Sequence, residues 1–177
     1  MEELIQEAKK GNKKAFETII LSLQDDLYRI AETRLENEDD IYDAMQETII
    51  TAFESINKLK QIQHFKTWLI RILINESNNI YRQKKKGKII PFEEIENREV
   101  SDFYNIEDIE TSMEVNDICK NLKYEDRMIV ILYYMEEFTD KEIGKILDLK
   151  ESTVTTKRTR AKQKIKDTFK VGGKNYE

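Results

Sequence analysis

Residues 138–166 carry the pattern that most restricts the fold, because it fits two short helices joined by a tight turn. Thr139 is followed three residues later by Glu142, the spacing of a capping box that starts a helix. Gly144 is small where a second helix has to cross closely, and residues 148–150 interrupt the helical period with a short polar turn. The apolar stripes are Ile143, Ile146 and Leu147 before the turn and Val154, Ala161 and Ile165 after it. The segment therefore predicts a helix-turn-helix.

The outward side of the second predicted helix carries hydroxyl groups and cations. Its members are Thr153, Thr155, Thr156, Thr159, Arg160 and Lys162. Residues 150–170 hold eight lysines or arginines against two acids, in a chain whose net charge is −5. A hairpin with a solvated basic face is the alternative, but a local reversal of the overall charge is the electrostatic footprint of a polyanion. Side chains of these types reach base edges and phosphates in a major groove, so the pattern predicts DNA binding.

The composition predicts an all-α protein that is not an enzyme. Five glycines and one proline among 177 residues suit one or two small helical domains. One cysteine, Cys119, and one histidine, His64, exclude an internal disulfide and a cysteine-rich or multi-histidine metal site. The two could form a nucleophile–base pair, but packing beside Ile118 and Leu122 explains Cys119 better. The sequence contains no phosphate-binding glycine loop. We therefore expect no cofactor.

The N-terminus predicts a cytoplasmic location. Residues 1–3 are acidic at the second and third positions and lack the basic and apolar regions of a signal peptide. No apolar run approaches the ~18 residues of a membrane span. We expect no membrane insertion.

The first predicted domain, residues 1–88, contains four helices. Gly11 and Asn12 separate a short helix from a long one, and residues 36–40 form a polar break before the third. The buried faces are expected to be Phe16, Ile19, Ile20, Leu23, Leu27, Ile30, Ala31 and Leu35 on the second helix, Ile41, Ala44, Met45, Thr48, Ile49, Ala52, Phe53 and Ile56 on the third, and Trp68, Leu69, Ile72, Leu73 and Ile80 on the fourth. The fourth helix ends in a basic run at residues 82–88.

Two acidic segments stand outside these apolar patterns. Residues 93–117 contain ten acids and one base, Arg98, which suits a linker extended by self-repulsion at 89–108, with a second domain at 109–177. Residues 36–47 contain six acids and no base. Complementation of a helix dipole explains the acids at the helix start but explains Glu47 poorly. A basic partner surface accounts better for the whole set.

With two helical blocks, a basic end on each and an acidic segment between them, the chain resembles the extracytoplasmic-function sigma factors of bacterial RNA polymerase. Residues 40–48 (DIYDAMQET) are similar to the family segment that binds the clamp helices of the largest polymerase subunit. Residues 65–75 (FKTWLIRILIN) are similar to the family's reader of the promoter −10 element. Residues 122–165 resemble its −35-binding domain. The resemblance covers nearly the whole chain and implies sigma region 2, an acidic flexible linker and sigma region 4.

The resemblance implies a promoter-specificity subunit with three partners, namely core RNA polymerase, promoter DNA and a membrane-linked anti-sigma factor. The residues implied for polymerase binding are Asp40, Asp43, Gln46 and Glu47. Those implied for the −10 element are His64, Phe65, Trp68, Asn75, Arg82, Lys84 and Lys85. Those implied for the −35 element are Ser152, Thr153, Thr155, Thr156, Lys157, Thr159, Arg160 and Lys162.

Some of these positions have competing interpretations. Trp68 suits a core anchor better than a base-stacking platform, whereas His64 and Phe65, in the preceding loop, are the better candidates to touch an unstacked base. Several positions depart from the family pattern: Ala44 and Met45 make the polymerase-facing segment less acidic than usual, and Lys123 stands where proline is common. Arg158 stands where leucine is usual on the inner side of the recognition helix, and Glu137 and Asp148 stand where glycine is usual. Asp148 can still fill its position in the turn, because aspartate tolerates left-handed geometry.

Two other functions fit the same sequence. A free-standing helix-turn-helix repressor or activator would dimerise on a palindrome. An adaptor or anti-termination protein would bind polymerase without reading promoters. The sequence offers no obvious heptad seam and no ligand-pocket signature, which counts against the first of them.

Overall fold

The structure is a computed structural model that describes residues 1–87, 118–119 and 121–172. The chain divides into two compact units, Met1–Lys88 and Ile89–Glu177. Within the described residues every regular element is a helix or a 3-10 turn, which confirms the all-α prediction. The predicted acidic linker at 89–108 lies outside the described residues.

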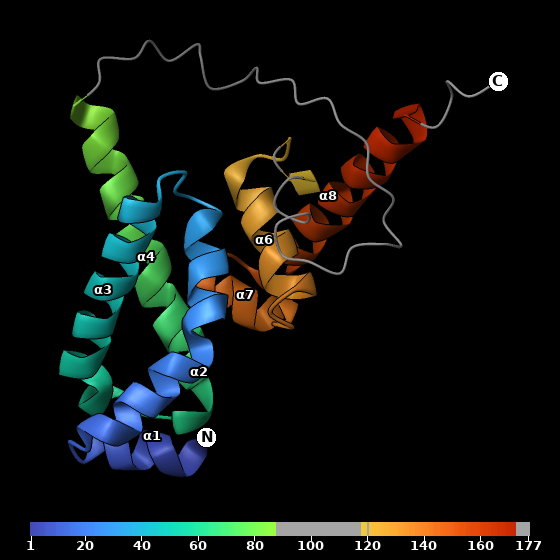
Figure 1. Ribbon diagram of the computed structural model, residues 1–177. Helices are drawn as coiled ribbons and strands as arrows, with labels where there is room; N and C mark the ends of the chain where they lie inside the picture. The colour runs from blue at the N-terminus through green and yellow to red at the C-terminus, as the bar shows by residue number, and fades with distance from the viewer. Residues whose placement is uncertain (88–117, 120, 173–177) are drawn as a thin grey trace. The chain divides into compact units, whose positions relative to one another are not determined.

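The first unit is a helical bundle. Its helices are α1 (Glu2–Lys9), α2 (Lys13–Glu32), α3 (Glu38–Ser55) and α4 (Phe65–Gly87), with 3-10 turns η1 (Ile56–Lys58) and η2 (Ile62–His64) between α3 and α4. Figure 1 shows α3 and α4 side by side along most of their length, with α1 lying across the end of the bundle. The buried faces of α2, α3 and α4 meet in the core.

Asparagine caps set the starts of the two central helices. Gly11 adopts φ +94°, a conformation that suits glycine, and ends the short first helix. The Asn12 side chain then accepts a hydrogen bond from the backbone N–H of Ala15 at 3.2 Å, which starts α2. Asn37 does the same for α3, accepting from the N–H groups of Asp39 and Asp40. The two predicted breaks are therefore confirmed.

The core of the first unit follows most of the predicted stripe on α2 and α3, except that Leu23, Met45 and Ile49 are only half-buried and Phe53 is exposed. The difference is larger on α4. Leu69 and Leu73 are buried as predicted, whereas the prediction that Trp68, Ile72 and Ile80 are buried was wrong, because all three are half-exposed. The buried side of α4 is turned toward Phe65, Leu69, Ile70, Leu73, Ile74 and Ser77. Because α4 packs against both α2 and α3, its buried arc is wider than one stripe.

The described helices of the second unit are α6 (Tyr124–Tyr134), α7 (Asp140–Leu147) and α8 (Glu151–Gly172). Cys119, Leu122, Val130 and Ala161 form a buried cluster, and Ile165 packs against it. Burial raises the pKa of the Cys119 thiol to about 11, so this side chain is a neutral thiol at physiological pH. The prediction that Cys119 packs as a small hydrophobe is confirmed.

The turn between α7 and α8 depends on the backbone conformation of Asp148 and on the small size of Gly144. Asp148 adopts the left-handed conformation with φ +57°, and the N–H of Leu149 donates to the carbonyl of Gly144 at 2.9 Å. A Cβ on Gly144 would lie 2.7 Å from the carbonyl oxygen of Leu149. The backbone of the turn therefore approaches α7 closely at Gly144. Glu137, before α7, also adopts a left-handed conformation, with φ +58°.

The left-handed position of Asp148 gives a test of this turn. Aspartate tolerates this conformation better than alanine, and glycine better than either. We expect the stability of the second unit to fall in the order Asp148→Gly, wild type, Asp148→Ala, with about 1 kcal/mol between the extremes. Calorimetric unfolding measures the order. An alanine variant as stable as the glycine variant would contradict the assigned backbone geometry.

Candidate functional site

The N-terminal half of α8 separates a buried side from an exposed one. Val154 and Ala161 are fully buried in the core of the second unit. Of the side chains predicted to face DNA, Thr153 and Lys157 are half-buried, and the exposed ones are Ser152, Thr155, Thr156, Thr159, Arg160 and Lys162. The helix therefore presents four short hydroxyls and two cations to solvent on the side opposite its packing face.

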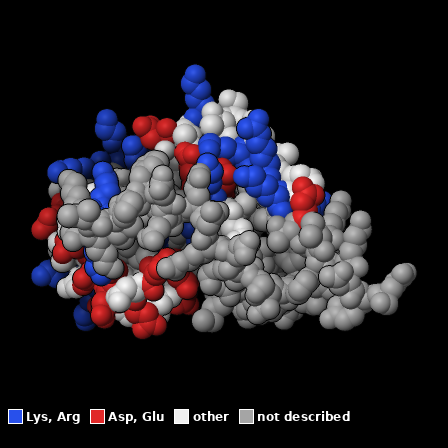
Figure 2. Space-filling model, turned by 90° about the horizontal axis from the view of Figure 1, so that it is seen from above, with Lys and Arg blue, Asp and Glu red and all other residues white. Residues whose placement is uncertain are grey.

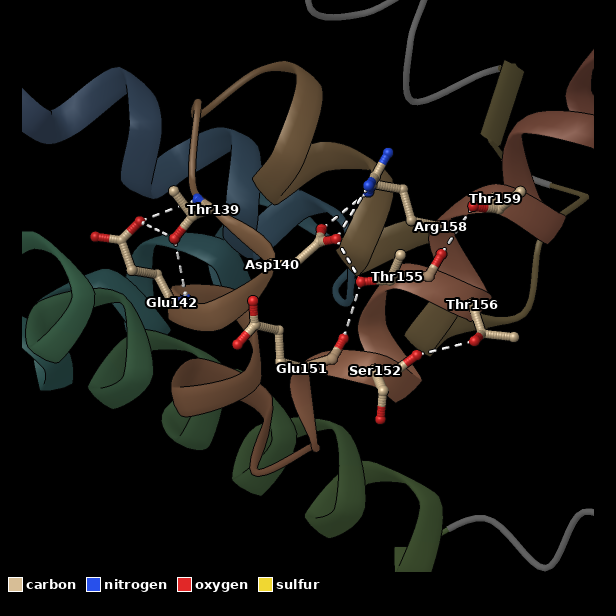
Figure 3. Close-up of polar contacts among 9 residues, drawn as sticks. All are labelled: Thr139, Asp140, Glu142, Glu151, Ser152, Thr155, Thr156, Arg158 and Thr159. Carbon is tan, nitrogen blue, oxygen red and sulfur yellow. Dashed lines mark hydrogen bonds and ion pairs between the residues drawn. The ribbon is translucent and has the colours of Figure 1, made fainter.

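The threonine hydroxyls on this face are bonded inward (Figure 3). Thr156 Oγ1 donates to the carbonyl of Ser152 at 2.8 Å, and Thr159 Oγ1 donates to the carbonyl of Thr155 at 2.9 Å. Because each proton is used within the helix, Thr156 and Thr159 offer lone pairs and methyl groups to a partner. Such groups accept hydrogen bonds from base amino groups and contact the methyl group of thymine.

Arg158 lies on the inner side of α8 and is bound by two other helices (Figure 3). Its Nε and Nη2 donate to the two carboxylate oxygens of Asp140, at 2.9 and 3.0 Å. The guanidinium also lies 3.9 Å from the centre of the Tyr133 ring. The hydrogen bond from Arg158 holds the pKa of the Asp140 carboxyl below its usual range and raises that of the guanidinium. An ion pair on an aromatic face thus takes the place of the apolar contact expected of a leucine.

Lys157 is half-buried and contacts α6. Its Nζ lies 2.7 Å from Glu125 Oε2 and 3.4 Å from Asp126 Oδ1, at the start of α6. The hydrogen bond with Glu125 raises the pKa of the lysine. The sequence placed Lys157 on DNA because its helical position borders the exposed side, but both acids compete for the same ammonium. We therefore assign Lys157 to the packing of α8 on α6.

The candidate −10 residues at the start of α4 are arranged differently from the sequence prediction. Phe65 is 2% exposed, so its ring is part of the core and offers no face to a base. Trp68 is half-exposed, with its ring centre 5.7 Å from that of Phe65. Burial of the two aromatic rings is therefore the reverse of the sequence prediction, with Phe65 in the core and Trp68 partly open. His64, the last residue before α4, is half-exposed, and Asn75, about two turns beyond Trp68 on α4, is exposed.

The basic end of α4 is joined to the acidic start of α3. Lys84 Nζ lies 2.6 Å from Asp40 Oδ1, and the Asp40 side chain is 11% exposed. Figure 1 shows the start of α3 beside the C-terminal part of α4. Asp40, predicted to bind polymerase, is thus held inside the unit by Lys84, which was predicted to bind phosphate. Arg82 and Lys85 are exposed, and Arg82 donates to the backbone carbonyl of Asn78.

The exposed side of α3 combines acids with large apolar side chains. Asp43, Gln46 and Glu47 are exposed, and their side chains form no hydrogen bond or ion pair with another residue in the described part of the chain. Beside them stand Tyr42, 57% exposed, Ile50, 44% exposed, and Phe53, 38% exposed. Figure 2 shows several acidic side chains (red) gathered at the lower left of the face in view, with few basic ones (blue) among them.

Sequence reasoning missed Tyr42 and Ile50 and placed Phe53 in the core. Tyr42 packs against Tyr28 with ring centres 5.9 Å apart, and Phe53 packs against Phe16 at 5.2 Å in an edge-type arrangement, so each ring contacts the bundle while part of it stays exposed. The available signal was the helical spacing of Tyr42, Ile49 and Phe53, which forms a second apolar stripe on α3 beside the buried one.

Within the described residues, no group of three or more acidic, histidine or cysteine side chains could hold a metal ion. None of the helices described is long and apolar enough to cross a lipid bilayer.

Comparison with known proteins assigns each unit. Residues 19–87 match the family model of sigma-70 region 2, and residues 113–165 match that of sigma-70 region 4. The chain is 30% identical to the ECF RNA polymerase sigma factor SigW of Bacillus subtilis over 173 residues, which cover 92% of each protein. It is 28% identical to SigV of the same organism over 155 residues, covering 86% of this chain and 90% of SigV.

Solved structures share the fold. CnrH, determined in complex with the cytosolic domain of CnrY, matches with a TM-score of 0.70 and 19% identity over 96% of this chain and 97% of CnrH. The sigma factor RpoE of Bartonella quintana, determined with the anti-sigma factor NepR, matches with a TM-score of 0.69 and 20% identity over 89% of this chain and 98% of RpoE.

Region 2 followed by region 4 defines a promoter-specificity subunit of bacterial RNA polymerase. The identity to SigW over nearly the whole length of both proteins is decisive within that class. The chain belongs to the extracytoplasmic-function sigma factors, as its sequence motifs predicted.

Proposed function

We propose that this sigma factor binds core polymerase through the exposed side of α3, reads duplex −35 DNA with α8, and captures melted −10 DNA on α4. The observation that carries the proposal is the side of α3 formed by Asp43, Glu47, Tyr42 and Phe53, where acids without described partners stand among exposed rings. Charges of one sign around an apolar centre suit a basic protein surface. Asp40 is left out of this surface because it is bound to Lys84.

A pull-down with core polymerase followed by transcription from a selected promoter tests the whole proposal. A sigma factor binds core enzyme and starts transcription. A free-standing regulator would bind DNA without core polymerase, and an adaptor would bind core polymerase without initiating. Either of those two results would overturn the proposal.

The proposed −35 reader consists of the outward side chains of α8, with base contacts from Thr156, Thr159 and Arg160 and supporting contacts from Ser152 and Lys162. Thr153, half-buried, borders this surface. The inward bonding of the hydroxyls supports contacts to base amino and methyl groups, and the arginine supplies the donor that a guanine edge requires.

Arg160→Ala tests whether the arginine reads a base or binds phosphate. We expect it to weaken −35 binding by about 1–3 kcal/mol and to relax preference at one base pair of the element. Binding of the holoenzyme to a set of −35 variants provides the measurement, with Lys162→Ala as the matched loss of one exposed cation. If Arg160→Ala weakened every sequence equally, Arg160 would be a phosphate clamp.

The proposed −10 reader is the exposed side of α4 from His64 to Asn75, with Arg82 and Lys85 on duplex phosphates nearby. Trp68 replaces Phe65 as the aromatic ring available to an unstacked base, since Phe65 is buried and Trp68 is half-exposed. The amide of Asn75 suits hydrogen bonding to the edge of an extruded base.

Asn75→Ala tests the −10 assignment. We expect the variant to bind double-stranded promoter with the wild-type −35 preference and to form open complexes poorly, because the base that Asn75 contacts is exposed only after the strands part. Binding to pre-melted promoter fragments should fall as well. Unchanged affinity for the pre-melted fragment would refute the assignment. Gln83→Ala, which removes an exposed amide about two turns further along α4, is the matched control.

The proposed regulatory partner is a membrane-linked anti-sigma factor that covers the exposed sides of α3 and α8. The complexes of CnrH with CnrY and of RpoE with NepR support such a partner by analogy. We place the protein in the cytoplasm, without catalytic activity or cofactor, because its proposed partners are there and its role is binding. Signal-independent activity of the chain in its native cell would contradict regulation by an inhibitor.

A further inference from the structure

The carboxylate of Asp140 accepts three hydrogen bonds from side chains of α8. The two from Arg158 lie at 2.9 and 3.0 Å, and Thr155 Oγ1 lies 2.7 Å from Asp140 Oδ2 (Figure 3). Asp140 is the first residue of α7, where a carboxylate also favours the helix dipole. The side chains of Asp140 and Arg158 are 13% and 19% exposed, so water screens their contact little.

This arrangement constrains rotation of α8 about its axis. Thr155 and Arg158 stand three residues apart on α8, nearly one turn, and both reach the same carboxylate. The planar fork of Arg158 donates both hydrogen bonds to that carboxylate in one relative orientation only. On its other side the guanidinium lies on the ring of Tyr133, in α6. An apolar side chain at position 158 would constrain the rotation of α8 less, because apolar contacts have no preferred direction.

We infer that Asp140 is a positioning residue for promoter reading, which sets the rotation of α8 through Arg158 and Thr155. Thr155 then serves the positioning of the helix and is not a base reader, although its side chain is exposed. Its hydroxyl lies 2.7 Å from the Asp140 carboxylate of another helix, besides 3.1 Å from the Glu151 carbonyl of its own helix, whereas the hydroxyls of Thr156 and Thr159 bond only within α8. The inference rests on the proposed function of α8 as the −35 reader.

The test uses the full chain with core polymerase and a promoter library randomised over the −35 region. The variants are Asp140→Asn, Arg158→Lys and Thr155→Val, which remove the charge, the fork and the hydroxyl while keeping side-chain size or charge. We expect each to lower the ratio of affinities for preferred and disfavoured −35 sequences about fivefold or more, at several base positions together. This ratio does not depend on how much of the protein is folded, so a merely structural role would leave it unchanged.

Two further variants separate positioning from reading. Thr155→Ser keeps the hydroxyl and should restore the wild-type ratio. Thr156→Val is the matched control, because it removes a hydroxyl that bonds only within α8 and should alter preference at one base position. Combining Thr155→Val with Asp140→Asn should give no more loss than one of them alone, since both break the same contact.

The outcomes distinguish this inference from the proposed function. A wild-type holoenzyme without any −35 preference overturns both. A preference that survives in Asp140→Asn and Arg158→Lys overturns the inference alone. A loss confined to one base position in Thr155→Val, additive with Asp140→Asn, makes Thr155 a base reader and also overturns it.

Discussion

Gly144→Ala is expected to destabilise the second unit by about 2 kcal/mol and to lower its melting temperature by roughly 10 °C. The added Cβ would lie 2.7 Å from the carbonyl oxygen of Leu149, which belongs to the turn backbone and cannot rotate away as a side chain would. The cost of displacing the turn, about 3 kcal/mol, exceeds the gain of about 1 kcal/mol in helix propensity. Because the turn sets where α8 begins, binding to −35 duplex should weaken as well.

Lys145→Ala is the control for this variant, because it places alanine at the neighbouring exposed position of α7. It should change stability by no more than about 0.5 kcal/mol. Calorimetry of the full chain reports both variants, and the transition of the first unit should stay in place. A Gly144→Ala protein as stable as Lys145→Ala would show that the turn approaches α7 less closely than described.

Asp43→Lys combined with Glu47→Lys is expected to weaken binding to core polymerase by two orders of magnitude or more. Placing like charges across an interface costs several kcal/mol, and every ~1.4 kcal/mol is a factor of ten in affinity. Both side chains are exposed and one turn apart on α3, so folding should be nearly unaffected. Titration of labelled core polymerase measures the affinity, and thermal unfolding checks the fold.

Glu3→Lys combined with Glu7→Lys is the matched control. It reverses two exposed acids at the same spacing on α1, in the same unit, and makes the same change of net charge. A general electrostatic effect would weaken polymerase binding equally in both double variants. Equal losses, or no loss from the α3 pair, would place the polymerase interface elsewhere.

The features that were predicted correctly from the sequence are local ones. The capping box of Thr139 and Glu142 forms as its spacing indicates, with reciprocal hydrogen bonds of 3.0 and 3.3 Å. The left-handed conformation at Asp148 followed from the tolerance of aspartate for it. Each depends on residues within one or two turns of one another, so sequence spacing is sufficient to predict them.

The features that were missed depend on contacts between distant residues. Asp40 and Lys84 are 44 positions apart, and Lys157 lies 31 positions from Asp126, so nothing in the local pattern pairs them. The orientation of α4 depends on two neighbouring helices, and periodicity alone could not choose between its adjacent stripes. Asp140 and Arg158 belong with these cases, since an arginine in place of leucine indicated a departure without indicating its partner.

The inward-bonded hydroxyls of α8 also bear on how promoter preference can diverge. The hydroxyls of Thr156 and Thr159 contact only carbonyls of their own helix, and Ser152 is likewise exposed. Substitutions at these positions should therefore cost little stability, within about 0.5 kcal/mol, while altering the groups presented to DNA. The scaffold and the recognition surface can thus vary independently. After duplication, genes that encode a sigma factor with this helix could acquire new target promoters through single substitutions. No earlier gain in stability would be needed to offset the cost of those substitutions.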